Sequence, residues 1–111
     1  RPQHWYNIAI GSSQTYIAMT VQSTGIKRVT IQVYIPDNKE LFGALNAQRQ
    51  QIEAELGMVN GIDWRELPAK KACRIVASHE GDFLNDAESP ALVEWMVETA
   101  DQFARVFPKY L

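Results

Sequence analysis

A strict alternation of apolar and polar residues near the start of the chain constrains its fold more than any other feature. Residues 6–35 contain three runs with an apolar residue at every second position, and turn-forming residues separate the runs. The third run places Val29, Ile31, Val33 and Ile35 in this alternation. Residues two apart lie on one face of a strand but scatter around a helix. The segment therefore predicts a three-stranded antiparallel meander.

The period of the pattern changes at Pro36. Residues 37–56 carry apolar side chains three and four positions apart, and Gly57 follows as a natural helix stop. Asp37 is expected to be the N-cap, with Glu40 as its capping-box partner. The face that includes Glu53 is expected to be solvated. One continuous amphipathic helix is predicted here.

The rest of the chain predicts two further strands and one further helix. Residues 63–67 and 72–77 indicate a hairpin, residues 78–88 a polar loop, and Ser89-Pro90 the start of a helix. The resulting order, β-β-β-α-β-β-α, predicts an α+β fold with an antiparallel sheet of about five strands and two helices on one face. With 111 residues, of which 46% are hydrophobic, residues 1–111 are expected to form a single domain.

Charge and composition exclude several classes of protein. The 11 Lys and Arg residues against 13 Asp and Glu residues leave a formal charge of -2, so the chain lacks the overall basic excess of a dedicated nucleic-acid binder. No apolar run has the length of a membrane helix, and we expect no membrane partner. The single cysteine, Cys73, cannot form an intramolecular disulfide, and we expect a cytoplasmic protein.

The sequence predicts no catalytic residue, no cofactor and no metal site. His4, Cys73 and His79 occur singly, without metal-ligand spacing, and the glycines form no phosphate-binding loop. Pro36-Asp37 matches the first half of the PD-(D/E)xK nuclease signature, in which two acidic positions hold a divalent ion. No acid-x-lysine element follows downstream of this match, so we interpret it as accidental.

The sheet face opposite the helices is the most informative predicted surface. It would combine polar residues with three aromatic side chains, and basic residues gather on the second hairpin beside it. Aromatic platforms next to cations are typical of single-stranded nucleic-acid binders. Alternatively, the basic residues only form a solvated edge hairpin, and the aromatic face packs in a homodimer or against a chain segment that precedes Arg1. The candidate surface residues are Trp5, Tyr16, Tyr34, Lys70, Lys71 and Arg74.

Two segments of the chain resemble the uncharacterised domain family DUF4268. The first is the predicted helix at residues 41–57, LFGALNAQRQQIEAELG, and the second is the hairpin at residues 63–75, DWRELPAKKACRI. The strand from Trp5 to Gly11 and the ending at Phe107-Pro108 are also similar to the family pattern. The resemblance covers most of the chain and implies a further helical segment before Arg1.

The resemblance implies a context rather than an activity. Members of the family are prokaryotic, and the domain is often the C-terminal part of proteins whose N-terminal half resembles a restriction-endonuclease-like nuclease. No catalytic residues are established for the domain. The resemblance therefore favours a non-catalytic accessory or binding module that works with a nuclease-like partner domain in DNA handling or defence. The alternative is an interaction protein that dimerises through the aromatic face and has no nucleic-acid role.

Overall fold

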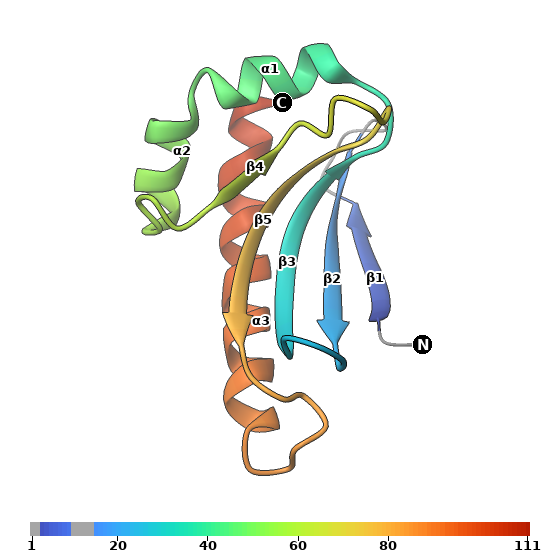
Figure 1. Ribbon diagram of the computed structural model, residues 1–111. Helices are drawn as coiled ribbons and strands as arrows, with labels where there is room; N and C mark the ends of the chain where they lie inside the picture. Colours follow the sequence, from blue (N-terminus) through green and yellow to red (C-terminus); the bar gives the residue numbers. More distant parts are fainter. Residues whose placement is uncertain (1–2, 10–14) are drawn as a thin grey trace.

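The computed structural model describes the backbone of residues 3–9 and all atoms of residues 15–111 (Figure 1). The strands are β1 (Gln3–Ala9), β2 (Tyr16–Gln22), β3 (Arg28–Ile35), β4 (Asp63–Arg65) and β5 (Cys73–Glu80). The helices are α1 (Lys39–Asn46), α2 (Arg49–Leu56), α3 (Ser89–Val106) and the short 3₁₀ helix η1 (Phe107–Tyr110).

The strands form one antiparallel sheet in the order β1-β2-β3-β5-β4. Four strands have seven or eight residues, whereas the edge strand β4 has three. The meander expected from the alternating pattern corresponds to β1, β2 and β3, and the hairpin to β4 and β5. The α+β class is confirmed.

One face of the sheet packs on α3, which runs behind the strands in Figure 1. The apolar alternates of β2, β3 and β5 meet the buried stripe of this helix, and the rings of Phe103 and Phe107 lie 5.1 Å apart at its C-terminal end. Complete burial of these side chains makes this layer the main core of the domain. Its fully buried members include Ile17, Val29, Ile31, Val33, Ile35, Ile75 and Phe103.

The prediction of a single helix over residues 37–56 is wrong, because the segment forms α1 and α2 with a turn at Ala47 and Gln48. The described residues therefore contain three α-helices rather than the expected two. In one continuous helix, the heptad spacing through Phe42, Leu45 and Ile52 would place Arg49 on the buried face. The turn changes the helix direction and leaves Arg49 exposed.

The predicted N-cap is also displaced by one residue. Asn38, not Asp37, caps α1, and its Oδ1 accepts a hydrogen bond of 2.9 Å from the backbone N–H of Leu41. Asn and Asp are equally good N-caps, so the pattern alone does not choose between neighbouring residues of this kind. Asp37 lies exposed in the preceding bend.

The side chain of Glu53 is buried, in contrast to the solvated face expected from the sequence. One carboxylate oxygen accepts from the backbone N–H of Asn60 at 3.0 Å, and the other accepts from the indole N–H of Trp64 at 2.8 Å. A buried carboxylate is tolerated when its oxygens are hydrogen-bonded. Glu53 thus joins α2 to the start of β4.

Candidate functional site

The sheet face opposite α3 is organised by strand register into rows of side chains. Residues 66–72 form the turn between β4 and β5, the β4–β5 turn. The row nearest this turn contains Tyr16 of β2, Tyr34 of β3, Arg74 of β5 and Arg65 of β4. We call these four residues the Tyr–Arg row. On β1, Ala9 pairs with Tyr16. Cross-strand neighbours on one face are close enough for their side chains to interact, so the row is a continuous surface.

The two tyrosines and Arg74 are in direct contact. The rings of Tyr16 and Tyr34 are tilted by 52° with centroids 5.3 Å apart, and the guanidinium carbon of Arg74 lies 4.5 Å from the Tyr34 centroid. These are the distances of favourable aromatic and cation–π contacts. Desolvation by burial, followed by the nearby Tyr34, raises the pKa of Tyr16, while Arg74 partly opposes this rise.

A chain of hydrogen bonds from β2 and β3 fixes the side chain of Arg74. Its Nη1 donates to Oε1 of Gln32 at 2.9 Å, and Nε2 of Gln32 donates to the hydroxyl of Thr30 at 3.0 Å. The hydroxyl groups of Thr30 and Thr20 form the next bond of the chain. Because each group is held by the next, the orientation of the guanidinium depends on residues of β2 and β3.

Electrostatics act on the same arginine. Desolvation lowers the pKa of Arg74, with a smaller lowering from Arg65, while the neighbouring tyrosines raise it. Arg65 lies opposite Arg74 in the sheet register and forms an ion pair of 2.5 Å with Asp63. The ion pair offsets the repulsion between two arginines placed as cross-strand neighbours.

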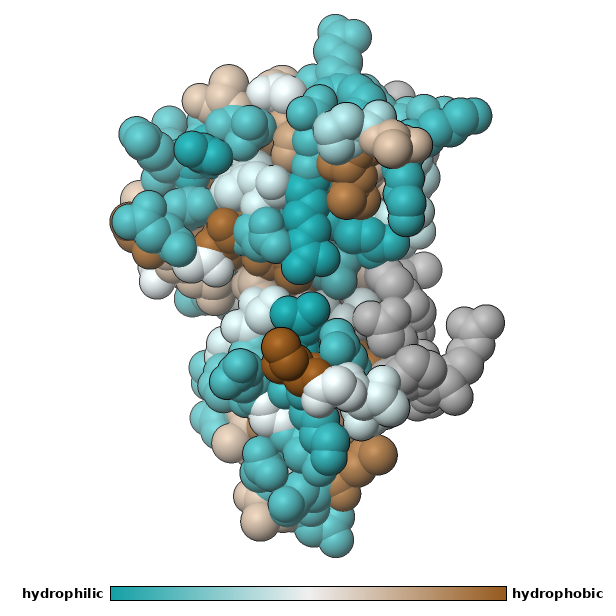
Figure 2. All heavy atoms as spheres, in the orientation of Figure 1, coloured by the Kyte–Doolittle hydropathy of each residue, from teal (hydrophilic) through white to brown (hydrophobic). Residues whose placement is uncertain are grey.

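The centre of this face is less open than the sequence predicted. No described helix covers it, yet Ala18 is 0% exposed and Thr20 1%, and Thr30, Gln32 and Val76 are also buried. Short side chains between longer neighbours have little accessible surface. Figure 2 shows this side of the molecule, on which hydrophilic residues predominate and hydrophobic patches are small and separate. Among the side chains that the structure describes, the partly exposed Tyr–Arg row therefore provides the aromatic surface of this face.

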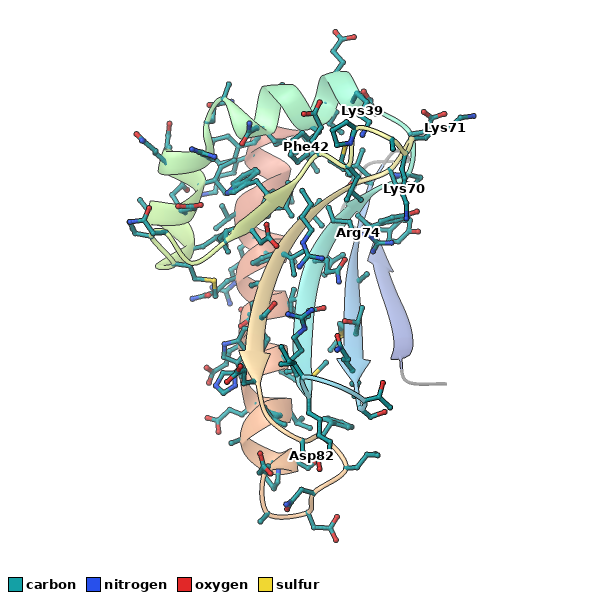
Figure 3. All side chains as sticks on the ribbon, viewed as in Figure 1. Lys39, Phe42, Lys70, Lys71, Arg74 and Asp82 are labelled. Carbon is teal, nitrogen blue, oxygen red and sulfur yellow. The ribbon has the colours of Figure 1, made fainter. Side chains whose placement is uncertain are left out.

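Lys70 and Lys71 lie in the β4–β5 turn at the end of the sheet where the Tyr–Arg row is found (Figure 3). Both side chains are exposed. Arg74 follows three residues later at the start of β5. The structure thus brings together Tyr16, Tyr34, Arg74 and the two lysines of the predicted surface.

The sixth predicted surface residue, Trp5, is placed only by its backbone. Trp5 pairs with Thr20 in the register of β1 and β2, which puts it on the face of the Tyr–Arg row but four residues along the strand from that row. Its side chain lies outside the described residues. Arg65, by contrast, joins the row although it was not among the predicted surface residues, because no sequence spacing reveals which residue lies opposite Arg74.

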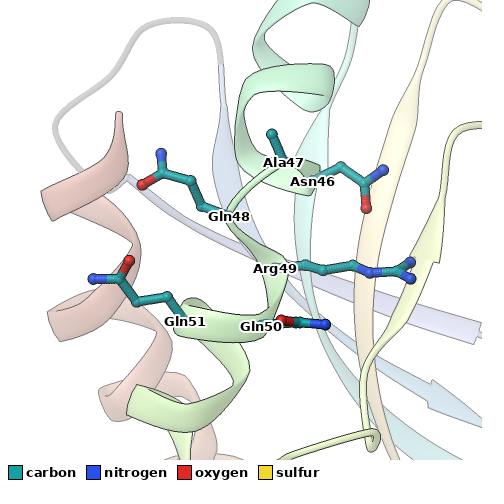
Figure 4. Close-up of a pocket in the computed structure, with 6 residues that line it drawn as sticks. All are labelled: Asn46, Ala47, Gln48, Arg49, Gln50 and Gln51. Carbon is teal, nitrogen blue, oxygen red and sulfur yellow. The ribbon is translucent and has the colours of Figure 1, made fainter.

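A pocket of about 490 Å³ opens at the α1–α2 turn (Figure 4). Its lining side chains diverge: Gln48 and Gln51 point to one side, whereas Asn46 and Arg49 point to the other. A second pocket, of about 370 Å³, adjoins the first turn of α1 and is lined by Asn38, Glu40, Leu41 and Ala44. Neither gathers the converging polar groups that mark a small-molecule site.

The described residues contain no cluster of three or more His, Cys, Asp or Glu side chains able to hold a metal ion. In the same part of the chain, no helix is long and apolar enough to cross a bilayer. Cys73 is buried, and its Sγ lies 3.3 Å from the carbonyl oxygen of Glu66.

Comparison with known protein families assigns the chain to one of them. The family model described as Domain of unknown function (DUF4268) matches residues 1–111, the whole sequence. The chain belongs to the DUF4268 family. The resemblance seen in the two sequence segments is therefore confirmed. No curated protein and no solved structure matches this DUF4268 chain significantly.

Proposed function

We propose that this DUF4268 domain is a non-catalytic module that binds single-stranded nucleic acid and works beside a nuclease-like partner domain. The observation that carries the proposal is the Tyr–Arg row, which lies at the same end of the sheet as Lys70 and Lys71. Stacking surface and positive charge are the two requirements for binding single strands without sequence preference.

The aromatic half of the surface is suited to unstacked bases. Tyr16 and Tyr34 are partly exposed, and their rings are held by the contact between them and by the packing of Arg74 on Tyr34. A rigid ring loses little conformational freedom when a base stacks on it. Bases within a duplex are already stacked on one another, so the row favours single strands.

The basic residues of the surface have different roles in this proposal. Arg74 is engaged by Gln32 and Tyr34, and it serves as part of the stacking platform. Lys70 and Lys71 are exposed at the turn, where phosphates of a strand lying along the row would pass. Each lysine that meets a phosphate releases counterions, and binding therefore depends on salt.

The non-catalytic part of the proposal rests on the residues around this surface. Catalysis of phosphodiester hydrolysis by metal-dependent nucleases requires acidic side chains that hold a divalent ion. Asp63 is the acidic residue nearest the row in the sheet register, and it is paired with Arg65. In this proposal the partner nuclease domain supplies the cleavage, in keeping with the context that the family resemblance implies.

The experiment is a fluorescence-anisotropy titration of the purified chain with a labelled single-stranded oligonucleotide and with its duplex, at several salt concentrations. We expect saturable binding of the single strand, weaker binding of the duplex and a decline in affinity with salt. The absence of binding at low salt would overturn the nucleic-acid role. Incubation with Mg²⁺ or Mn²⁺ should produce no cleavage, and reproducible cutting abolished by a point mutation in this chain would overturn the non-catalytic role.

A further inference from the structure

The ammonium group of Lys39, at the first residue of α1, binds the backbone of the β4–β5 turn (Figure 3). Its Nζ donates to the carbonyl oxygen of Glu66, to that of Leu67 at 2.8 Å and to that of Ala72 at 3.3 Å. These acceptors lie 27 to 33 residues away in sequence and flank Lys70 and Lys71 on both sides. One side chain therefore joins the two ends of the turn.

The number of acceptors around the Lys39 ammonium matches its number of donors. An ammonium group has three N–H donors and no acceptor, and here three carbonyl oxygens surround it. The N-terminus of a helix repels a cation, because the helix dipole is positive there. Lys39 occupies this unfavourable position on α1, and the carbonyl oxygens of the turn compensate for it.

The backbone of the turn adopts an uncommon conformation. Leu67 has a φ of 54°, a left-handed conformation that is uncommon for a residue other than glycine. Its carbonyl oxygen accepts a second hydrogen bond, of 2.9 Å, from the backbone N–H of Lys70. Ordering the residues of an exposed turn costs conformational entropy, and the hydrogen bonds of Lys39 offset part of this cost.

We infer that Lys39 is a positioning residue, which fixes the β4–β5 turn so that Lys70 and Lys71 are presented in one arrangement beside the Tyr–Arg row. Its part in ligand binding rests on the proposed function, whereas its effect on the turn does not. Because its ammonium is already bound to carbonyl oxygens, Lys39 contributes no phosphate contact of its own.

The structural part of the inference is tested with Lys39→Met and with Lys27→Met as the matched control. Lys27 forms an ion pair of 3.4 Å with Asp82 at the opposite end of the sheet, so the control removes the same charge far from the turn. We expect tryptic cleavage after Lys70 and Lys71 to be about tenfold faster in Lys39→Met than in the control, because local opening exposes the turn to the protease. Equal rates would overturn the inference.

A second measurement uses the wild type and does not depend on the folding of any variant. The backbone N–H of Lys70 is expected to exchange with deuterium at least about tenfold more slowly than in an unstructured chain, because it is held to the Leu67 carbonyl. An unprotected amide at Lys70 would show that the turn is not fixed and would overturn the inference. Urea denaturation of both lysine variants separates local opening from a global loss of stability.

The binding part of the inference is tested by the salt dependence of oligonucleotide affinity. A positioning residue predicts that Lys39→Met raises the Kd about tenfold at every salt concentration and leaves the salt slope unchanged. A direct phosphate contact predicts a slope smaller by about 0.7, and that result would overturn the inference. If the wild type binds no oligonucleotide, the proposed function fails and the binding role of Lys39 fails with it, while the tryptic and exchange measurements still decide its effect on the turn.

Discussion

The guanidinium carbon of Arg74 lies 4.5 Å from the centroid of the Tyr34 ring, and the two residues are direct partners in the register of β3 and β5. Tyr34 also contacts Tyr16 on the adjacent strand. The tyrosine is therefore flanked on one side by a ring and on the other by a cation. This position makes Tyr34 the central residue of the candidate surface.

Tyr34→Ala is predicted to weaken single-strand binding. The loss should be about 1–3 kcal/mol in binding free energy, the usual contribution of one base stacked on an aromatic side chain. Tyr34→Phe keeps the ring and should bind within about 0.5 kcal/mol of the wild type. Fluorescence anisotropy at fixed salt measures both effects, and wild-type affinity in the alanine variant would contradict a stacking role.

The double variant Lys70→Ala, Lys71→Ala is predicted to reduce the salt dependence of binding. Loss of two phosphate contacts should lower the log–log slope by about 1.4, given roughly 0.7 per contact on a single strand. The further change Arg74→Ala should weaken binding more than it changes the slope, since Arg74 supports the platform.

The matched control for the lysines is Lys27→Ala, Lys109→Ala, which removes the same charge from two exposed ion pairs, with Asp82 and Glu55. Such surface pairs contribute little to stability. An equal change of slope in the control and the turn variant would show that net charge, rather than the β4–β5 turn, governs binding.

The alternative role, a homodimer through the aromatic face, predicts a concentration-dependent mass. A stable interface needs about 800 Å² from each partner, whereas among the residues whose side chains the structure describes, the exposed aromatic surface of this face is confined to the Tyr–Arg row. We therefore expect light scattering to show a monomer for both the wild type and Tyr34→Arg. A wild-type dimer that the substitution dissociates would favour the interaction protein instead.

Glu53→Ala is predicted to destabilise the fold. The change leaves the indole N–H of Trp64 and the backbone N–H of Asn60 without their acceptor, which should cost about 1–3 kcal/mol of unfolding free energy. The exposed Glu98→Ala is the control and should shift the unfolding free energy by less than about 0.5 kcal/mol. Urea denaturation followed by tryptophan fluorescence measures both, and similar midpoints would contradict a structural role for Glu53.

The parts of the fold that follow from local patterns were predictable from the sequence. Alternation identified the meander, and the apolar stripe after Pro90 identified α3. The break between α1 and α2 was not predicted, because the apolar residues on either side keep heptad spacing and only Arg49 departs from it. Periodicity reports which face is buried, but a change of helix direction preserves much of the same pattern.

The sequence predicts which residue types form the candidate site, but not the contacts that these residues make with one another. Tyr16, Tyr34 and Arg74 could be assigned to a face by alternation alone. The pairing of Arg74 with Arg65 depends on the register of a three-residue strand, and the contact of Lys39 with the turn is made to backbone carbonyls. Backbone acceptors are present at every residue and leave no signature in a sequence.

The order of the strands has a consequence for folding. Tyr16 and Tyr34 lie on the local meander, which we expect to form early because its contacts close short loops. Arg74 and Gln32 are hydrogen-bonded across 42 residues of sequence. Their contact therefore forms only when β5 pairs with β3, which closes a long loop that contains α1, α2 and β4. The Tyr–Arg row is therefore complete only in the native chain, and a partly folded intermediate that lacks β5 would carry the rings without the cations.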